Sequence, residues 1–292
     1  MSVPGRSLVV GAAGQVGHQI VEALGLENTL CAGRSVRPGW LQVDLAELAN
    51  SPENLDEIFE QYEIDAVYCV GGATDVERCE ADTEWAMQTN HLGPAALASR
   101  CTHIPFIYFS TEYVFDGLDG PYTETSEKNP VSVYGLSKSL GEEAVLRMHS
   151  TALVLRTTVV YGEDPGGKNF LYSLRRNLAS GQTMSVPVDQ FSTPTYNRDL
   201  ARATIALVHA SRYGIFHICG PELLSRYDFA VQAALEMKLD SRMLRGVVTS
   251  DLAQKAKRPL RAGLLTEKLT QSVPEVRMRT VAEGIDDWLG QD

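Results

Sequence analysis

The chain has 292 residues, of which 44% are hydrophobic and 22% charged. This composition excludes long disorder, and the length predicts one large domain or two unequal ones. The formal net charge of −11 repels nucleic-acid phosphates and anionic lipids, so we expect neither nucleic acid nor a membrane as a partner.

Short apolar segments alternate with helical patterns through the first half of the chain. Residues 7–10 predict a strand that runs directly into a glycine-rich turn, and a helix of period 3.6 follows and ends at Gly25. Further strands are predicted at residues 29–32, 40–43, 66–70, 105–109 and 153–156, and helices at residues 51–62, 80–100 and 134–148. We expect Gly93-Pro94 to bend the helix at 80–100.

After Gly162 the pattern becomes less regular and predicts a mixed α/β region. Helices are predicted at 169–180, 197–210, 226–238 and 278–289, and strands at 216–219 and 245–249. The alternation in the first half predicts a doubly wound parallel sheet, which binds ligands at the carboxyl ends of its strands. We therefore expect a cofactor domain at residues 1–162, joined by segments around 190–220, and a mainly substrate-binding lobe at 163–292.

A glycine triplet at the first strand-helix junction predicts a dinucleotide site. Gly11, Gly14 and Gly17 are three residues apart, with Gln15 and Val16 between the last two. This spacing allows a tight turn and a close approach of the backbone, with the helix N-terminus facing a pyrophosphate. A turn that merely packs is the alternative interpretation.

Residues at the ends of the next strands indicate which dinucleotide binds. Arg34 and Ser35 follow the second strand, where a guanidinium and a hydroxyl suit a 2′-phosphate, so we expect NADPH in preference to NADH. Asp44-Leu45, after the third strand, is expected at the adenine or in a solvated turn. Gly71, Gly72 and Ala73, after the fourth strand, complete the predicted cofactor side.

Tyr134 and Lys138 lie four residues apart and therefore share one helix face. A nearby ammonium and a positive nicotinamide would lower the pKa of the phenol, so that Tyr134 passes a proton to a carbonyl oxygen. Ser110-Thr111, at the end of the fifth strand, supplies a hydroxyl to polarise the same carbonyl. These residues predict a carbonyl reductase.

Together these features resemble the extended short-chain dehydrogenase/reductase superfamily, whose nucleotide domain has the Rossmann fold. The segment from Phe109 to Gly117 resembles the Ser-Thr-Asp-Tyr-Val-Phe-x-Gly segment of the dTDP-4-dehydrorhamnose reductases. Residues 189–195 resemble their Asp-Gln-x-Gly-x-Pro-Thr segment, and residues 258–264 resemble their late Arg-Pro-x-x-x-x-Leu. Residues 74–77 fall where that family has Thr-x-Val-Asp.

The resemblance implies a catalytic set of Thr111, Tyr134 and Lys138. It places Thr74, Val76, Glu112 and Tyr113 against the sugar and Arg258 on the nucleotide side. The implied reaction is reduction of the 4-keto group of a nucleotide-linked 6-deoxysugar, carried by dTDP, in deoxysugar biosynthesis.

Several residues depart from the family pattern, all in the substrate half. Glu112 replaces an aspartate, Ser192 a glycine and Val159 a tryptophan, and the late loop reads Leu260-Arg261-Ala262-Gly263. Two other functions therefore stay open, an epimerase or dehydratase of sugar nucleotides and a non-catalytic NADP-binding regulatory subunit. A dehydratase needs a second carboxylate after the threonine, where this chain has Tyr113.

The remaining polar residues indicate no metal and a reducing compartment. The six histidines show no ligand spacing along the chain, so we expect no metal. Five cysteines without a Cys-x-x-Cys pair indicate reduced thiols and a cytoplasmic protein. A homodimer is the default expectation for oligomeric state.

Overall fold

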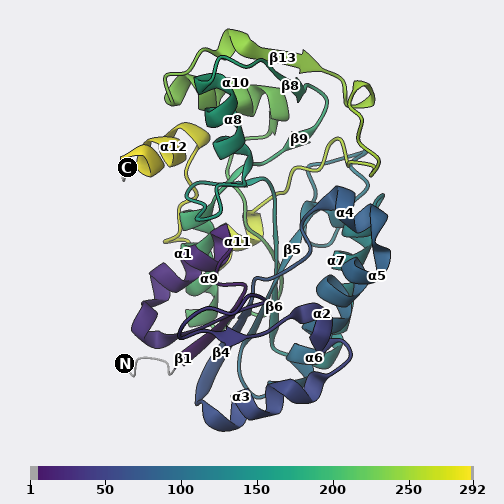
Figure 1. Ribbon diagram of the computed structural model, residues 1–292, viewed down its shortest axis with the longest axis vertical. Helices are drawn as coiled ribbons and strands as arrows, with labels where there is room; N and C mark the ends of the chain where they lie inside the picture. The colour runs from purple at the N-terminus through teal and green to yellow at the C-terminus, as the bar shows by residue number, and fades with distance from the viewer. Residues whose placement is uncertain (1–5, 291–292) are drawn as a thin grey trace.

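The computed structural model describes residues 6–290, which form a central parallel sheet and a smaller lobe above the sheet in Figure 1. The sheet has seven strands in the order β11-β6-β5-β4-β1-β2-β3, and every pair in it is parallel. The bounds are β1 Arg6–Val10, β2 Thr29–Gly33, β3 Leu41–Gln42, β4 Ile64–Cys69, β5 Phe106–Thr111, β6 Ala152–Thr157 and β11 Gly214–His217. The predicted doubly wound sheet is confirmed. Its strand order reverses between β1 and β4, which is where such sheets bind ligands.

Helices cover both faces of the sheet, and its strands are therefore buried on both sides. Successive residues of β1 alternate between two apolar clusters: Leu8 and Val10 face one, and Val9 faces the other. The first cluster is covered by α2, α3, α6 and α7, and the second by α1, α9 and α11. The bounds are α1 Gln15–Leu24, α2 Leu45–Leu48, α3 Asp56–Gln61, α6 Gly93–Arg100, α7 Val133–Met148, α9 Asn197–His209 and α11 Glu267–Ser272.

The helix predicted at 80–100 is divided into several segments. α4 (Val76–Ala81) and α5 (Thr83–Met87) are separated at Asp82, whose carboxylate accepts from the N–H of Trp85. A π-helical turn (Gln88–Leu92) then leads into α6. Pro94 has no N–H to donate to the carbonyl of Asn90, four residues earlier, and that carbonyl accepts the Tyr108 hydroxyl at 2.6 Å instead. The expected bend at Gly93-Pro94 thus takes the form of a widened turn.

The lobe has its own apolar core and is assembled from several later segments. α8 (Phe170–Ala179), α10 (Arg226–Glu236) and α12 (Val281–Leu289) pack around buried Leu174, Phe229 and Trp288. The parallel pair β8 (Met184–Pro187) and β13 (Leu244–Val247) covers this core. Two shorter pairs link the lobe to the sheet, namely β7 (Val160–Tyr161) with β10 (Thr195–Tyr196) and β9 (Phe191–Ser192) with β12 (Leu224–Ser225).

The five cysteines are all free and buried. Burial raises the pKa of the Cys69, Cys101 and Cys219 thiols to about 12, so these side chains act as small apolar core groups. Among residues 6–290, no helix has the length and apolar character needed to span a bilayer.

Candidate active site

The turn between β1 and α1 requires glycine at two positions. Gly11 has a φ of +93°, and a Cβ there would lie 2.5 Å from the backbone nitrogen of Gly71. A Cβ on Gly17 would lie 2.2 Å from the Gly11 carbonyl oxygen. Gly14 occupies the N-cap of α1 without a side-chain cap, which leaves the first-turn N–H groups for an anion. These donors fit a pyrophosphate.

The other predicted cofactor residues lie around this turn. Gln15 accepts a hydrogen bond from Asn169 at 3.0 Å, which connects the turn to the lobe, and Val16 packs on the sheet. Arg34 and Ser35 are exposed after β2. The Asp44 carboxylate caps α2 by accepting from the Ala46 N–H at 2.9 Å, and Leu45 is buried beneath it.

The segment after β4 passes close to Lys138. A Cβ on Gly72 would lie 2.9 Å from Lys138 Nζ and 3.0 Å from Asn90 Oδ1, so glycine allows these two side chains to approach the backbone closely. Ala73 is buried, and both of its backbone polar groups bond the Asn90 amide, at 2.8 and 3.0 Å. The Asn90 amide also donates to Ser137 on α7 at 3.0 Å. Asn90 therefore aligns the β4 loop with the helix that carries Tyr134 and Lys138.

The structure brings Thr111, Tyr134 and Lys138 together at the carboxyl end of β5. All three side chains are buried. Lys138 Nζ donates to the Phe109 carbonyl at 2.9 Å, and the Thr111 hydroxyl acts to lower the pKa of the Tyr134 phenol. The Ser132 hydroxyl caps α7 by accepting from the Gly135 N–H at 3.2 Å, which sets the start of the helix at Val133, one residue before Tyr134.

The expectation of a lowered phenol pKa is wrong for the protein alone. Burial, followed by the charge of Glu112, raises the pKa of Tyr134 above its usual range, and the Thr111 hydrogen bond only partly opposes this. Burial also lowers the pKa of Lys138 to about 8. Tyr134 is thus a neutral phenol at pH 7, the form that donates a proton.

Ser110 does not share the site of Thr111, because adjacent residues of a strand point to opposite faces. The Ser110 hydroxyl donates to Glu142 Oε1 at 2.6 Å, and Arg156 binds the same carboxylate through two hydrogen bonds of 2.8 and 2.7 Å. Glu142 and Arg156 are almost fully buried. Only the backbone of Ser110 is therefore left to contact the cofactor. The Glu142–Arg156 ion pair was not predicted, because spacing along the sequence does not show which distant residues pair.

Glu112 is a second buried carboxyl and has no arginine hydrogen-bonded to it among residues 6–290. Only 5% of it is exposed, and its Oε2 accepts the Thr111 hydroxyl at 2.9 Å. Burial raises its pKa, against the lowering effects of the Thr158 and Thr111 hydroxyls and the charge of Arg226. Arg226 was missed by sequence reasoning, because it lies at the start of a lobe helix, 114 positions from Glu112 in the printed sequence.

The expected sugar-side residues form the rim of the site. Tyr113 packs edge-on against Tyr134, with ring centroids 5.2 Å apart. Thr74 is exposed and Val76 half-buried at the start of α4. Arg258 Nη2 donates to Glu77 at 2.8 Å, and its buried Nη1 has no hydrogen-bond partner within the described part of the chain. An unpaired buried guanidinium nitrogen suits an anionic group of a ligand.

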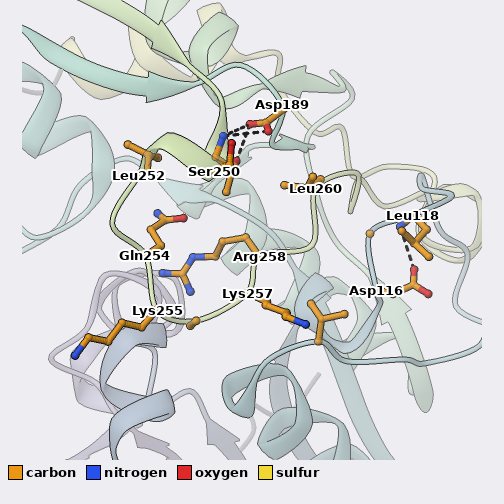
Figure 2. Close-up of a pocket in the computed structure, with 14 residues that line it drawn as sticks. Asp116, Leu118, Asp189, Ser250, Leu252, Gln254, Lys255, Lys257, Arg258 and Leu260 are labelled. Atoms are coloured by element: carbon orange, nitrogen blue, oxygen red, sulfur yellow. Dashed lines mark hydrogen bonds between the residues drawn. The ribbon is translucent and has the colours of Figure 1, made fainter.

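A pocket of about 490 Å³ opens beside Arg258. Figure 2 shows Arg258 amid Gln254, Lys255 and Lys257, with Asp116 and Leu118 on another side and Asp189 above. Asp189 supports this segment by accepting from the Thr249 N–H and hydroxyl. The two lysines and the arginine make a local cationic surface on an acidic protein, and the volume is typical of ligand pockets.

Val159, where the family often has tryptophan, has a strained backbone. Its φ of +41° lies in the left-handed region, which is rare for a β-branched residue. Its carbonyl accepts from the Thr195 N–H at 3.2 Å, next to the β7/β10 pair. Strain of this kind clusters at functional sites, and it is held here by the surrounding strands.

One histidine lies near two glutamates, although the spacing of the histidines along the chain indicated no set of metal ligands. Ligand atoms of His18, Glu22 and Glu163 lie within 4.8 Å of one another. The residues come from α1 and from the loop that precedes α8, so only the tertiary structure brings them together.

The whole chain matches one protein family. Residues 5–291 match the RmlD substrate binding domain family. The chain belongs to this family. It is 34% identical to a dTDP-4-dehydrorhamnose reductase of Burkholderia thailandensis, over 77% of this chain and 76% of that protein. The resemblance to these reductases is thereby confirmed.

Two further comparisons bear on the cofactor and on the alternatives. A dTDP-4-dehydrorhamnose reductase of Bacillus anthracis, solved in complex with NADP, superposes with a TM-score of 0.88 and 26% identity, over 99% of this chain and 100% of that one. Subunit beta of methionine adenosyltransferase 2 from Danio rerio is 31% identical, over 90% of this chain and 84% of that protein.

Proposed function

We propose that this protein is an NADPH-dependent reductase of the 4-keto group of a nucleotide-linked 6-deoxysugar, with dTDP as the carrier. The observation that carries the proposal is the buried cluster of Thr111, Tyr134 and Lys138 at the carboxyl end of β5. The reductases among its relatives support the same reaction. Residues 1–162, with the returning segments around 190–220, hold the cofactor in this proposal, and residues 163–292 mainly hold the substrate.

The residues around β1, β2 and β4 fit a dinucleotide. The turn at Gly11, Gly14 and Gly17 would hold the pyrophosphate, and Arg34 with Ser35 would bind a 2′-phosphate, which favours NADPH over NADH. Lys138, whose Nζ lies against the Gly72 backbone, would hold the nicotinamide ribose. When bound, the reduced nicotinamide supplies hydride to the carbonyl carbon of the sugar.

The proton comes from this chain. Tyr134, a neutral phenol, donates its proton to the carbonyl oxygen as hydride reaches the carbon, and the Thr111 hydroxyl polarises the same carbonyl. Lys138 is predominantly an ammonium below pH about 8 and holds the ribose. A positioned acid of this kind contributes about 10²–10⁴ in rate.

The diphosphate and base would lie along the cationic surface of Lys255, Lys257 and Arg258. The pocket there reaches from Asp116 to the 249–260 segment. Thr74, Val76, Glu112 and Tyr113 would then face the sugar. Reduced, buried thiols support a cytoplasmic location, and a homodimer is the simplest assembly.

The test is direct. The protein is mixed with NADPH and dTDP-6-deoxy-L-lyxo-4-hexulose, and the loss of nicotinamide absorbance is followed beside Tyr134→Phe. We expect oxidation that falls by about 10²–10⁴ in Tyr134→Phe, because the variant keeps the ring and loses the donated proton. Equal rates in the two proteins would remove Tyr134 from this role.

A regulatory, NADP-binding subunit is the second candidate, favoured by the likeness to the methionine adenosyltransferase subunit. Such a protein would bind NADPH and oxidise none of it with any nucleotide sugar. It would also retain a catalytic subunit in stoichiometric amount when used as bait. An epimerase or dehydratase would instead turn over without added reductant.

A further inference from the structure

The pocket beside Arg258 is bordered by a stretch of chain without regular secondary structure. Residues 252–260 follow the helical turn Thr249–Asp251 and belong to no helix or strand. Both ends of the stretch are anchored. Gln190 Nε2 donates to the Thr249 hydroxyl at 3.1 Å before it, and the Arg261 N–H donates to the Gly117 carbonyl at 2.9 Å after it. Where the middle of the stretch lies therefore depends on side chains from other parts of the chain.

One carboxylate holds this middle part. Glu77 Oε2 accepts from the Lys255 N–H at 2.9 Å, and its Oε1 accepts from Arg258 Nη2 at 2.8 Å. Glu77 lies in the first turn of α4, which the Asp75 carboxylate caps by accepting from the Arg78 N–H at 3.0 Å. A residue on a short, capped helix thus fixes both the backbone and the side chain of a segment that lies far from it in sequence.

The same bonds leave Arg258 with an unused donor. Only 11% of the Arg258 side chain is exposed, and its Nη1 is buried without a hydrogen-bond partner among residues 6–290. Figure 2 shows this side chain reaching across the loop toward Gln254 and Lys255, and Arg258 lines the pocket. A buried charged donor that makes no hydrogen bond is costly, so an oxygen of a bound anion is the acceptor that would complete it.

We propose that Glu77 is a positioning residue for the substrate, which holds Arg258 so that the free Nη1 meets an oxygen of the diphosphate. This rests on the proposed function, whose substrate is a nucleotide-linked sugar. An arginine side chain has many rotamers, and ordering it on binding costs affinity. Glu77 orders the guanidinium before the ligand arrives. Lys255 and Lys257 have exposed side chains, so they supply charge without a fixed geometry.

Calorimetric binding of dTDP tests the proposal without turnover. Glu77→Gln keeps the size, but replaces one accepting oxygen by an amide nitrogen that only donates. We expect dTDP to bind about tenfold more weakly, since Arg258 is no longer ordered. The affinity for NADPH should be unchanged, because the glycine turn holds that diphosphate. Glu77→Asp restores both oxygens and should recover dTDP binding in part. Glu84→Gln, an exposed change on α5, is the matched control and should bind dTDP as the wild type does.

A double-mutant cycle shows whether Glu77 acts through Arg258. Arg258→Ala should weaken dTDP binding by about 10²-fold. Adding Glu77→Gln to Arg258→Ala should change it by less than about twofold, because the group that Glu77 orders is gone. A further tenfold loss in the double variant overturns the proposal. So does an unchanged dTDP affinity in Glu77→Gln, or an equal loss of NADPH affinity, which would mean a general structural role.

Steady-state kinetics separate this proposal from the reductase function. Glu77→Gln should raise the KM for the keto-sugar about tenfold and leave kcat within about twofold, because the diphosphate is held equally in the ground state and the transition state. Cys79 of α4 packs in one buried cluster with Tyr134, so a disturbed helix would lower kcat instead, and that result overturns the proposal. If the wild type reduces no keto-sugar, the reductase function fails, and the dTDP cycle still decides the role of Glu77.

Discussion

Ser110 and Thr111 are neighbours on β5, and each hydroxyl donates to a buried glutamate, yet the two glutamates are held differently. Glu142 has the guanidinium of Arg156 on both carboxylate oxygens, with the Lys128 ammonium 3.5 Å away. Glu112 accepts the Thr111 hydroxyl, and the charge of Arg226 acts on it without a hydrogen bond. A paired carboxylate is fixed in its charged form, whereas a carboxyl with neutral partners exchanges protons at low cost. One strand thus carries a hydroxyl on a charge-paired carboxylate next to a hydroxyl on a buried carboxyl without such a pair.

The largest expected effect is on folding, at the paired glutamate. Glu142→Gln leaves the Arg156 guanidinium buried without a counter-charge, and this should lower the free energy of unfolding by about 3–5 kcal/mol. Glu112→Gln removes no ion pair and should change the free energy of unfolding by less than about 1 kcal/mol at low pH. Urea unfolding of the two variants measures both values. Equal losses would mean that the two sites do not differ as described.

The two hydroxyls offer a sharper pair of substitutions. Thr111→Val should lower kcat by about 10²-fold, because a donor to the developing oxyanion is lost. Ser110→Ala should leave kcat within about twofold and cost about 1–2 kcal/mol of stability, since one bond to a charged group is removed. Steady-state kinetics and thermal unfolding on both variants check this. A large kcat effect from Ser110→Ala would place its hydroxyl in the reaction.

Lys138 is a buried cation, and no carboxylate among residues 6–290 is hydrogen-bonded to it. Its pKa is about 8 in the folded protein against 10.5 ordinarily, so the unfolded chain binds more protons between these values. The stability that Lys138 contributes is therefore present above pH 10.5 and lost as pH falls through 8. Lys138→Met should be more stable than the wild type by about 1–3 kcal/mol at pH 7. Its advantage should vanish above pH 10.5, as unfolding curves across this range would reveal.

The smallest effect is expected at an exposed cation. Arg34→Ala should raise the KM for NADPH about tenfold, the equivalent of about 1.4 kcal/mol, and leave the KM for NADH unchanged, because only NADPH carries the 2′-phosphate. Steady-state kinetics with the two cofactors decide it. An unchanged KM for NADPH would leave Arg34 as a solvated surface residue.

Sequence reasoning succeeded where a function depends on neighbours along the chain. The glycine turn was found because Gly11, Gly14 and Gly17 lie within seven residues, and Tyr134 and Lys138 because a helix places residues four apart on one face. It failed for partners far apart in sequence, such as Arg226 beside Glu112 or Glu163 beside His18. A bend was expected at Gly93-Pro94, but not the π-helical turn before it or the hydrogen bond from the distant Tyr108 hydroxyl to the Asn90 carbonyl.

The sequence alone determined the alternation of strands and helices, the parallel sheet and the residues at the ends of its strands, because these follow from local periodicity and turn chemistry. The tertiary structure decided which hydroxyl of the Ser110-Thr111 pair faces the site and which glutamate is paired with an arginine. It also reversed the expected direction of the Tyr134 pKa shift. These properties depend on burial and on the charges brought near each group, and only the packing of distant segments sets them.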